Sequence, residues 1–222
     1  MTIKSVIAID GPAGAGKSTI AKMAARQLGF TYIDTGAMYR AVAWRVLQRF
    51  APPVTTQQII SVLSDIDIQL GYDDKGSMTV KVNGTDVSTA IRTPEVTALV
   101  SQAAAVPEVR TKMVDLQRKM AESGHVLMDG RDIGTCVLPD ADLKIYLTAS
   151  ADERARRRAK ELQAKGYDVD TEKIKSDIIA RDKADSERKV SPLRRADDAV
   201  LLDTTDMTIE EVLAAIINMA KG

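Results

Sequence analysis

A glycine-rich segment near the start of the chain constrains its fold more than any other feature. Residues 11–18 read Gly-Pro-Ala-Gly-Ala-Gly-Lys-Ser and fit the phosphate-binding pattern G-x-x-x-x-G-K-[ST]. The run 6–9 before it is continuously apolar, as in a parallel strand that is buried on both faces. Residues 19–28 after it have apolar side chains at helical spacing, and Gly29 follows as a stop signal. This order of strand, loop and helix places backbone N–H groups around a phosphate at a helix N-terminus.

The glycine loop therefore predicts a site for a nucleoside triphosphate. Lys17 can reach the β- and γ-phosphates, and the Ser18 hydroxyl can bind Mg²⁺. Asp129, which ends the predicted strand 125–129, is expected to contact the same metal through water. A capping role is the alternative for this acid, because acids at strand ends are common. The residues expected to bind the nucleotide are Gly11, Pro12, Ala13, Gly14, Ala15, Gly16, Lys17, Ser18 and Thr19.

The composition argues against several classes of partner. Lysine plus arginine and aspartate plus glutamate each total 31, so no field of the whole protein favours nucleic acid. The single cysteine, Cys136, cannot form an intrachain disulfide, which suits a reducing cytoplasm. The first apolar run is too short for a signal peptide, and none approaches the ~18 residues that cross a membrane. We therefore expect a cytoplasmic protein that binds neither nucleic acid nor membrane. We also expect a monomer, although the composition does not determine the oligomeric state.

The order of the apolar runs predicts the fold class. Short apolar runs alternate with stretches of helical periodicity, which indicates an α/β fold with a parallel β-sheet flanked by helices. We expect residues 1–222 to form a single domain around this sheet. Besides the run before the glycine loop, the predicted strands are 31–34, 125–129, 143–147 and 200–203.

Two segments depart from this alternation and are predicted as insertions. Between residues 66 and 91 the apolar period changes to two, which is typical of β-strands. Turns are expected at Asn83-Gly84 and at residues 73–76, so this segment predicts a small antiparallel β insert. The other insertion, about 150–190, is predicted as two charged helices.

The segment 150–190 carries arginines at helical spacing. Arg181 and Arg188 lie seven residues apart, with Asp185 on the same helix face. Phosphoryl transfer spreads negative charge over the transferred group, so the two helices are predicted as a lid over phosphates. The alternative is a solvated pair of charged helices, because acidic residues are interspersed. Arg154, Arg157 and Arg158 share the first of the two helices.

Two predicted helices begin with a capping box, in which two side chains cap the first turn reciprocally. Ser150 precedes Glu153 by three residues at the start of the lid, and Thr208 precedes Glu211 in the same way before the last helix. We expect each serine or threonine and its glutamate to bond to the other's backbone N–H.

Further motifs narrow the class of phosphate-binding protein. The guanine-reading sequence Asn-Lys-x-Asp of GTPases and the Ser-Gly-Gly signature of transport ATPases are both absent. Residues 129–135 read Asp-Gly-Arg-Asp-Ile-Gly-Thr, and residues 34–40 read Asp-Thr-Gly-Ala-Met-Tyr-Arg. Together with further segments, these motifs extend over essentially the whole chain. The further segments are 87–88, 91–96, 181–182, 185–186, 188, 191–193 and 196–199. On these residues the chain resembles bacterial cytidylate kinases, which are nucleoside monophosphate kinases.

The resemblance implies an activity and a set of residues. It implies transfer of the γ-phosphoryl group of ATP to CMP or dCMP, with Mg²⁺ as cofactor and with residues about 35–105 as a monophosphate-binding insert. The arginines implied to bind ATP with the glycine loop are Arg154, Arg157 and Arg158. The residues implied to be catalytic are Lys17, Arg131, Arg181 and Arg188. The residues that match the family's monophosphate site are Thr35, Arg40, Ser101, Arg110, Arg131, Asp132, Arg181, Asp185 and Arg188.

The implied contacts to phosphate and ribose have physical rationales. A guanidinium fork matches phosphate oxygens, so Arg40, Arg110 and Arg131 would hold the acceptor phosphate. For Arg40 and Arg110 the alternative is an ordinary arginine on a helix surface. Arg181 and Asp185 could reach the ribose hydroxyls, and their alternative is a pair four residues apart on one helix.

The implied contacts to the base explain how cytosine would be selected. Asp132 would accept a hydrogen bond from the cytosine amino group, with help from Ser101. Uracil has a carbonyl group at that position and would face an acceptor. The alternative role for Asp132 is a helix N-cap. The family often has serine where Thr35 stands, and threonine keeps the hydroxyl group.

Two other functions remain open from the sequence. A kinase for a different monophosphate or for shikimate would share the glycine loop but would lack the Asp132 and Ser101 contacts. A non-catalytic nucleotide-binding module would bind ATP without transferring phosphate. The arginines of the lid argue against the second alternative, since a protein that only binds ATP has little need of a mobile cationic lid.

Overall fold

The chain folds into two units in a computed structural model that describes residues 5–74, 78–164 and 166–222. The first unit is formed by Met1–Ile33 together with Ala121–Gly222, and the second by Asp34–Met120. The first unit contains the glycine loop and the predicted lid. The second begins one residue before the predicted insert of about 35–105 and continues past its end.

The first unit is built on a five-stranded sheet. Its strands are β1 (Val6–Asp10), β2 (Thr31–Asp34), β6 (Val126–Gly130), β7 (Leu143–Thr148) and β8 (Val200–Asp203). The order across the sheet is β2-β6-β1-β7-β8, and β1 pairs in parallel with both β6 and β7. Strands β7 and β8 also pair in parallel. The prediction of a parallel sheet with strands at these positions is confirmed.

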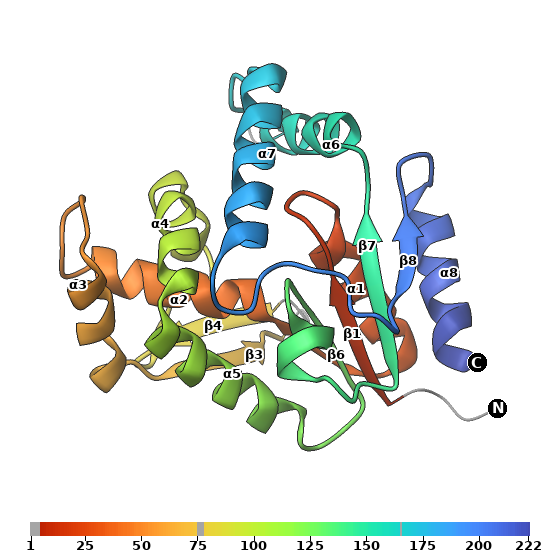
Figure 1. The fold of residues 1–222 in the computed structure, drawn as a ribbon, viewed down its shortest axis with the longest axis horizontal. Helices are drawn as coiled ribbons and strands as arrows, with labels where there is room; N and C mark the ends of the chain where they lie inside the picture. The colour runs from red at the N-terminus through yellow and green to blue at the C-terminus, as the bar shows by residue number, and fades with distance from the viewer. Residues whose placement is uncertain (1–4, 75–77, 165) are drawn as a thin grey trace. The chain divides into compact units, whose positions relative to one another are not determined.

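Helices cover this sheet and extend from its edge. Helix α1 packs against α8 beside the sheet, and α6 and α7 form a pair that follows the carboxyl end of β7 (Figure 1). A π-helical turn, η3, follows β6. The bounds are α1 (Lys17–Leu28), η3 (Ile133–Val137), α6 (Ala151–Ala164), α7 (Thr171–Glu187) and α8 (Ile209–Lys221). The predicted α/β class with a helical lid segment is confirmed.

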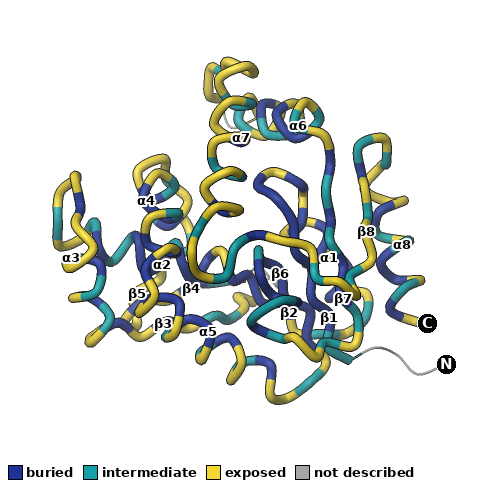
Figure 2. The backbone as a smooth tube through the Cα atoms, viewed as in Figure 1, coloured by how far each residue is buried: buried dark blue, intermediate teal, exposed yellow. Residues whose placement is uncertain are grey.

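The core of the first unit explains why its central strands read as continuous apolar runs. Ile7, Ile9, Leu127, Ile145 and Leu147 are each at most 1% exposed. Figure 2 shows the central strands buried and α7 exposed along most of its length. Burying one such side chain contributes about 1.5–3 kcal/mol to stability, so the sheet is the rigid part on which the loops are mounted.

The second unit combines helices with a small antiparallel sheet. Strands β3, β4 and β5 pair in that order, and β3 pairs antiparallel with β4. The predicted β insert is therefore confirmed, including the turn at Asn83-Gly84 between β4 and β5; Lys75 and Gly76 of the other predicted turn lie outside the described residues. The bounds are α2 (Thr35–Leu47), α3 (Thr56–Ser61), η1 (Leu63–Asp65), β3 (Ile68–Tyr72), β4 (Met78–Val82), β5 (Thr85–Asp86), η2 (Ala90–Arg92), α4 (Pro94–Ala105) and α5 (Pro107–Ala121).

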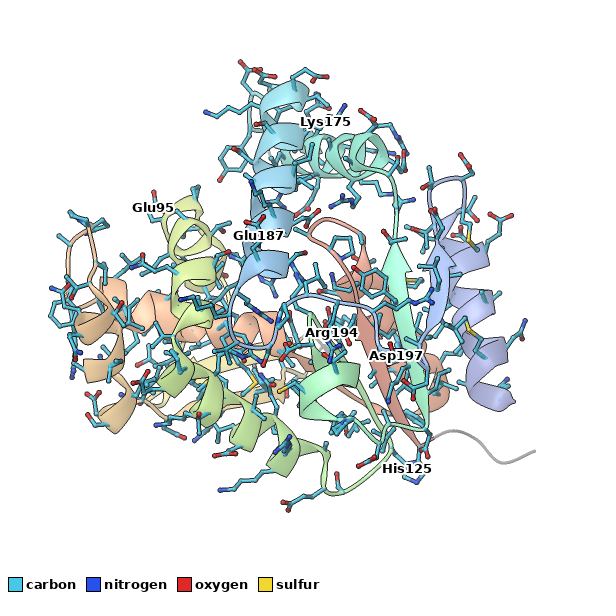
Figure 3. The ribbon with its side chains drawn as sticks, viewed as in Figure 1. Glu95, His125, Lys175, Glu187, Arg194 and Asp197 are labelled. Carbon is cyan, nitrogen blue, oxygen red and sulfur yellow. The ribbon has the colours of Figure 1, made fainter. Side chains whose placement is uncertain are left out.

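The two ends of the parallel sheet in the first unit differ in chemistry. The glycine loop follows the carboxyl end of β1, whereas the only histidine, His125, precedes the amino end of β6 (Figure 3). Its ring makes an edge contact with Phe30, with 5.5 Å between the ring centroids. The histidine thus has a structural contact at the end of the sheet opposite the loop. Across the described ranges, no helix is both long and apolar enough to cross a membrane.

Candidate functional site

The glycine loop connects β1 to α1 in a conformation that requires two of its glycines. A Cβ atom at Gly11 would lie 1.9 Å from the carbonyl oxygen of Leu147, so no larger residue fits there. Gly16 is the N-cap of α1 and is left-handed, with φ of 85°, and it provides no side-chain cap. The N–H groups that begin α1 are therefore not bonded by a capping side chain, and such groups bind anions.

Lys17 is the first residue of α1 and is buried. Only 5% of it is exposed, and its Nζ donates to the carbonyl oxygen of Pro12 at 2.7 Å. Burial is the main cause that lowers the pKa of Lys17 well below its ordinary value, followed by the positive charge of Arg131, while Arg181 adds a smaller effect in the same direction. Two nearby carboxylates oppose this shift. A cation in this position is suited to a phosphate, whose negative charge would offset the cost of burial.

Ser18 and Asp129 lie together behind the loop. The Ser18 hydroxyl donates to Oδ2 of Asp129 at 3.0 Å, and the Tyr32 hydroxyl donates to Oδ1 at 2.7 Å. Tyr32 thus orients a carboxylate that is only 3% exposed. A hydroxyl and a carboxylate are hard oxygen donors of the kind that Mg²⁺ prefers, so this pair fits the predicted metal site.

Four of the predicted acceptor residues meet where the segment after β6 approaches the end of α7. Arg131 donates from Nε to Oδ2 of Asp185 at 2.9 Å. Arg188 pairs with Asp132, with 3.4 Å between Nη2 and Oδ1. Asp132 is 3% exposed and Asp185 is 6% exposed. Carboxylates buried to this degree need charged or hydrogen-bonding partners. The side chain of Asp132 makes no capping hydrogen bond to η3, so the alternative role of N-cap is not the one seen.

In the second unit, α2 carries Arg40 and an aromatic side chain beside it. Arg40 donates from Nη1 to Oγ1 of Thr97, on α4, at 2.7 Å. The guanidinium group of Arg110, on α5, lies 5.3 Å from the centroid of the Tyr39 ring, which is within the range of a cation–π contact. Both arginines are therefore held by neighbours from other helices of their own unit. Tyr39 lies within the motif 34–40 but was given no role, and Thr97 was not singled out, because neither is charged or part of a metal or nucleophile motif.

The remaining predicted acceptor residues of the second unit lie on α2 and α4. Asp34 caps α2 by accepting the N–H of Ala37 at 2.9 Å, and its other oxygen lies 3.7 Å from Nη2 of Arg92. This cap fixes the first turn, where Thr35 is buried. Ser101 is half-buried on α4, which packs against α2.

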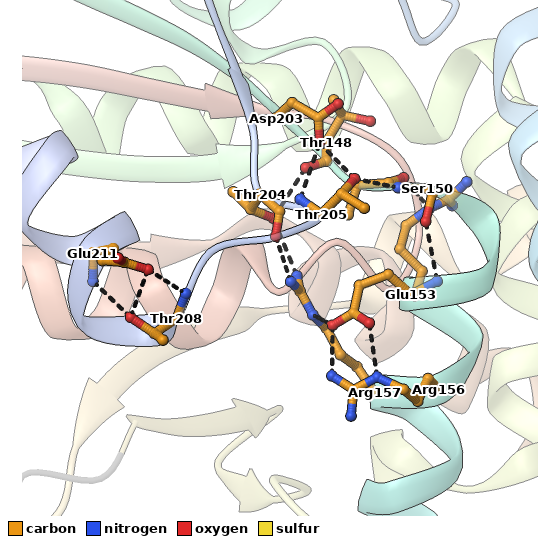
Figure 4. Close-up of polar contacts among 12 residues, drawn as sticks. Thr148, Ser150, Glu153, Arg156, Arg157, Asp203, Thr204, Thr205, Thr208 and Glu211 are labelled. Atoms are coloured by element: carbon orange, nitrogen blue, oxygen red, sulfur yellow. Dashed lines mark hydrogen bonds and ion pairs between the residues drawn. The ribbon is translucent and has the colours of Figure 1, made fainter.

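The three lid arginines predicted to bind ATP have different surroundings. Arg157 donates to the Glu153 carboxylate at 2.7 Å and to the Thr204 carbonyl oxygen at 2.6 Å (Figure 4). Arg158 pairs with Glu161 at 2.7 Å and is half-buried. Arg154, by contrast, is 7% exposed and contacts the glycine loop directly. Only Arg154 of the three is bonded to the loop here, and the ATP-binding role of all three stays a prediction.

One of the two predicted capping boxes is complete. Thr208 and Glu211 cap α8 reciprocally (Figure 4). The Ser150 side chain does accept the N–H of Glu153 at 3.2 Å, but the N–H of Ser150 donates to Thr205 instead of to the glutamate. This half of the prediction is wrong because the Glu153 carboxylate is taken by arginines, whose charge-assisted bonds are stronger than one to a neutral N–H.

A carboxylate that the sequence did not single out connects the lid to the glycine loop. Asp182, on α7, accepts the N–H of Ala13 at 2.9 Å and pairs with Arg154 at 2.5 Å. Arg154 also donates to the carbonyl oxygens of Ala13 and Ala149, at 2.8 and 2.9 Å. These contacts join α6, α7 and the loop into one network. Residue 182 was visible only as part of an Arg-Asp dipeptide, and the contact spans 169 positions of the chain.

Replacing Asp182 by alanine is expected to loosen the lid. The change removes a charged acceptor from the buried Arg154 and from Ala13, which should cost about 1–2 kcal/mol of unfolding free energy. For a chain of this size that is a fall in melting temperature of about 2–8 °C, measured by circular dichroism. Asp177→Ala is the matched control, because Asp177 is exposed on the same helix. Equal melting temperatures for the two variants would contradict the network.

Comparison with known proteins identifies the family. A family model described as cytidylate kinase matches residues 7–222. The chain belongs to the cytidylate kinase family. The cytidylate kinase of Desulfitobacterium hafniense is 54% identical over 213 residues, which cover 96% of this chain and 91% of that protein. The cytidylate kinase of Carboxydothermus hydrogenoformans is 50% identical over 213 residues, 96% of each chain. The structure of an uncharacterized protein from Eubacterium ventriosum matches with a TM-score of 0.55 at 10% identity, over 98% of each chain. This likeness shows a shared fold alone.

Membership of the cytidylate kinase family confirms the resemblance seen in the sequence. It makes the chain a kinase, so a protein that only binds nucleotide is disfavoured. The individual roles of the site residues stay predictions, and their geometry supports the function that follows.

Proposed function

We propose that this member of the cytidylate kinase family transfers the γ-phosphoryl group of ATP to CMP or dCMP, giving ADP and CDP or dCDP. One observation carries the proposal. The loop that ends in Lys17 follows β1, and the segment with Arg131 and Asp132 follows the adjacent, parallel β6. A phosphate loop and a paired Arg–Asp segment thus emerge from neighbouring strands at the same end of the sheet, where α/β proteins bind ligands.

The donor half of the proposed site uses the glycine loop. Backbone N–H groups within residues 11–19, where every residue except Pro12 has one, would surround the β-phosphate of ATP at the start of α1. Lys17 would exchange its bond to the Pro12 carbonyl, 2.7 Å long, for bonds to the β- and γ-phosphates. Arg157 and Arg158 would reach ATP only by leaving Glu153 and Glu161, so we expect nucleotide binding to break these two ion pairs.

We infer Mg²⁺ as the metal that accompanies ATP. Ser18 would bind it directly, and Asp129 would bind one of its water ligands. Within the ranges that the structure describes, no group of three or more His, Cys, Asp and Glu side chains could hold a metal by itself. This agrees with a metal bound mainly by phosphate and water, as is usual for Mg²⁺. When bound, it would neutralise charge on the phosphates.

The acceptor half would use the arginines that match the family's monophosphate site. Arg40, Arg110 and Arg131 would hold the phosphate of CMP, and Arg181 and Asp185 would contact its ribose. The bonds of Arg131 to the Asp185 carboxylate at 2.9 Å and to the Gly130 carbonyl oxygen at 3.4 Å orient the guanidinium group. An arginine has five N–H donors, so further donors remain for phosphate.

Cytosine would be recognised by Asp132 with help from Ser101, and Thr35 would line the same acceptor site. Asp132 is 3% exposed and faces Arg188, so it is held as a hydrogen-bond acceptor. The cytosine amino group is a donor that matches this acceptor, whereas the uracil carbonyl would face it with a second acceptor.

The proposed reaction is an in-line transfer. An oxygen of the CMP phosphate attacks the γ-phosphorus, and the bond from that phosphorus to the bridging oxygen breaks, with its electron pair leaving on ADP. Lys17, Arg131, Arg181 and Arg188 would stabilise the charge of the transferred group. The attacking oxygen belongs to an anion and needs no general base. We expect the enzyme to work as a cytoplasmic monomer.

The proposed substrate is tested by comparing acceptors with one donor. Purified protein with MgATP should form ADP with CMP and dCMP, measured by coupling to NADH oxidation, with a kcat/KM about 100-fold or more above that for UMP or AMP. Shikimate and buffer without acceptor serve as controls. Better turnover of UMP, AMP or shikimate would replace the proposed acceptor, and ATP binding without turnover of any acceptor would contradict the kinase function.

A further inference from the structure

The last residue of β1 has a role that the phosphate loop does not explain. Asp10 precedes Gly11, and only 5% of it is exposed. Its Oδ1 accepts the N–H of Ile133 and its Oδ2 accepts the N–H of Gly134, each at 2.8 Å. One carboxylate thus uses each oxygen on a separate backbone group that lies more than 120 residues away in the chain.

These two N–H groups begin η3, directly after Asp132. A helical turn has N–H groups at its start without intrahelical partners, and the residue before it normally caps them. Asp132 occupies that position but makes no capping hydrogen bond with its side chain. Asp10 bonds the first two N–H groups of η3 instead, and the Asp132 carboxylate faces Arg188.

The packing around Gly134 leaves little room for the turn to move. A Cβ atom at Gly134 would lie 3.1 Å from Cδ and 3.2 Å from Cγ of Lys144, and 3.5 Å from Oδ2 of Asp10. Lys144 is itself 8% exposed and pairs with Asp198 at 2.7 Å. The turn is therefore held between the Asp10 carboxylate and the stem of a buried lysine.

The charge of Asp10 is unfavourable for the folded state. Burial is the main cause that raises its pKa to about 6, and the negative charge of Asp132 adds to this. The N–H groups of Gly134 and Ile133 and the charge of Lys17 oppose the shift. A neutral side chain at this position would avoid the cost of burying a charge, so stability alone does not account for an aspartate here.

We propose that Asp10 is a positioning residue that holds the segment carrying Arg131 and Asp132 for the acceptor nucleotide. The inference rests on the proposed function, because that function gives Arg131 and Asp132 the role of binding the acceptor nucleotide. It means that the strand leading into the donor loop also sets the geometry of the acceptor residues. Asp10 itself touches neither substrate.

Asp10→Asn separates this role from a general structural one. The amide is the same size, but it has one acceptor oxygen, and its NH₂ group would face an N–H of η3. We expect the KM for CMP to rise about 10-fold, which corresponds to the loss of one hydrogen bond to a charged group. The KM for MgATP should change less than about 2-fold. The melting temperature should change little, since removal of a buried charge offsets the loss of one hydrogen bond. Asp140→Asn, at an exposed position in the same unit, is the control.

The outcomes distinguish the alternatives. An unchanged KM for CMP, or equal rises in both KM values with a lower melting temperature, would overturn the role of Asp10. If Asp10→Asn does not fold, Gly134→Ala addresses the same turn, because its methyl group would lie 3.1 Å from the Lys144 side chain and push that side chain and the turn apart while Asp10 keeps its charge. That variant should raise the KM for CMP and not that for MgATP, and a KM for CMP equal to wild type would overturn the proposal. Failure of the wild type to turn over CMP would instead contradict the proposed function.

Discussion

Replacing Lys17 by methionine is expected to lower kcat for phosphoryl transfer by about 10²–10³-fold, the range seen when one group that stabilises transition-state charge is removed. Lys17 is the buried cation at the start of α1, and its Nζ is held at the loop by the Pro12 carbonyl. Methionine fills a similar volume without the charge. The loss should appear in kcat more than in the KM for CMP, measured in the coupled assay at saturating MgATP.

The same substitution should not destabilise the protein. Because burial and the charge of Arg131 lower the pKa of Lys17, its charged form is less favourable in the folded than in the unfolded chain, and the cost is present at neutral pH. The melting temperature of Lys17→Met should therefore equal or exceed that of wild type. Lys22→Met is the control, because Lys22 is exposed on the same helix. A loss of activity that tracks a lower melting temperature would show that Lys17 supports the fold and not the reaction.

Local patterns explain which parts of the fold the sequence predicted. The apolar run of β1 and the helical spacing of α1 depend on neighbouring residues, and both elements were found where they were expected. The hairpin of β4 and β5 follows from Asn83-Gly84, where Asn83 has φ of 50° and Gly84 of 81°. Positive φ at both positions is what a tight hairpin turn requires.

Competition between side chains explains the prediction that was only half correct. The spacing of Ser150 and Glu153 predicts a reciprocal cap, but Arg156 and Arg157 both bond the Glu153 carboxylate at 2.7 Å. These bonds lower the pKa of Glu153 to about 2, with the bond from Arg156 as the largest cause. A capping pattern takes no account of arginines one turn further along the helix.

The supporting residues of the site could not be predicted from sequence patterns. Asp10 bonds Ile133 and Gly134, and Asp182 bonds Ala13, across 123 or more positions of the chain. Such contacts depend on which strands are adjacent in the sheet and on where α7 packs. The motif residues could be proposed from the sequence because each carries chemistry of its own, whereas the residues that orient them are recognisable only in three dimensions.

Replacing Asp132 by alanine is expected to weaken CMP binding by about 10- to 100-fold, the range expected for one hydrogen bond to a charged group. Asp132 is 3% exposed, so the cytosine amino group would lose its partner in a site with little access to water. UMP binding should change little or improve, since the carboxylate that opposes its carbonyl is removed. Asp132→Asn should also reduce the preference for CMP, because an amide offers both a donor and an acceptor.

Asp197→Ala is the control for these variants, because Asp197 is an exposed acid in the same unit (Figure 3). The decisive measurement is calorimetric titration of wild type, Asp132→Ala and Asp197→Ala with CMP and with UMP. Recognition of cytosine by Asp132 predicts that the ratio of CMP to UMP affinity falls about 10-fold or more in Asp132→Ala alone. An unchanged affinity of Asp132→Ala for CMP would contradict it.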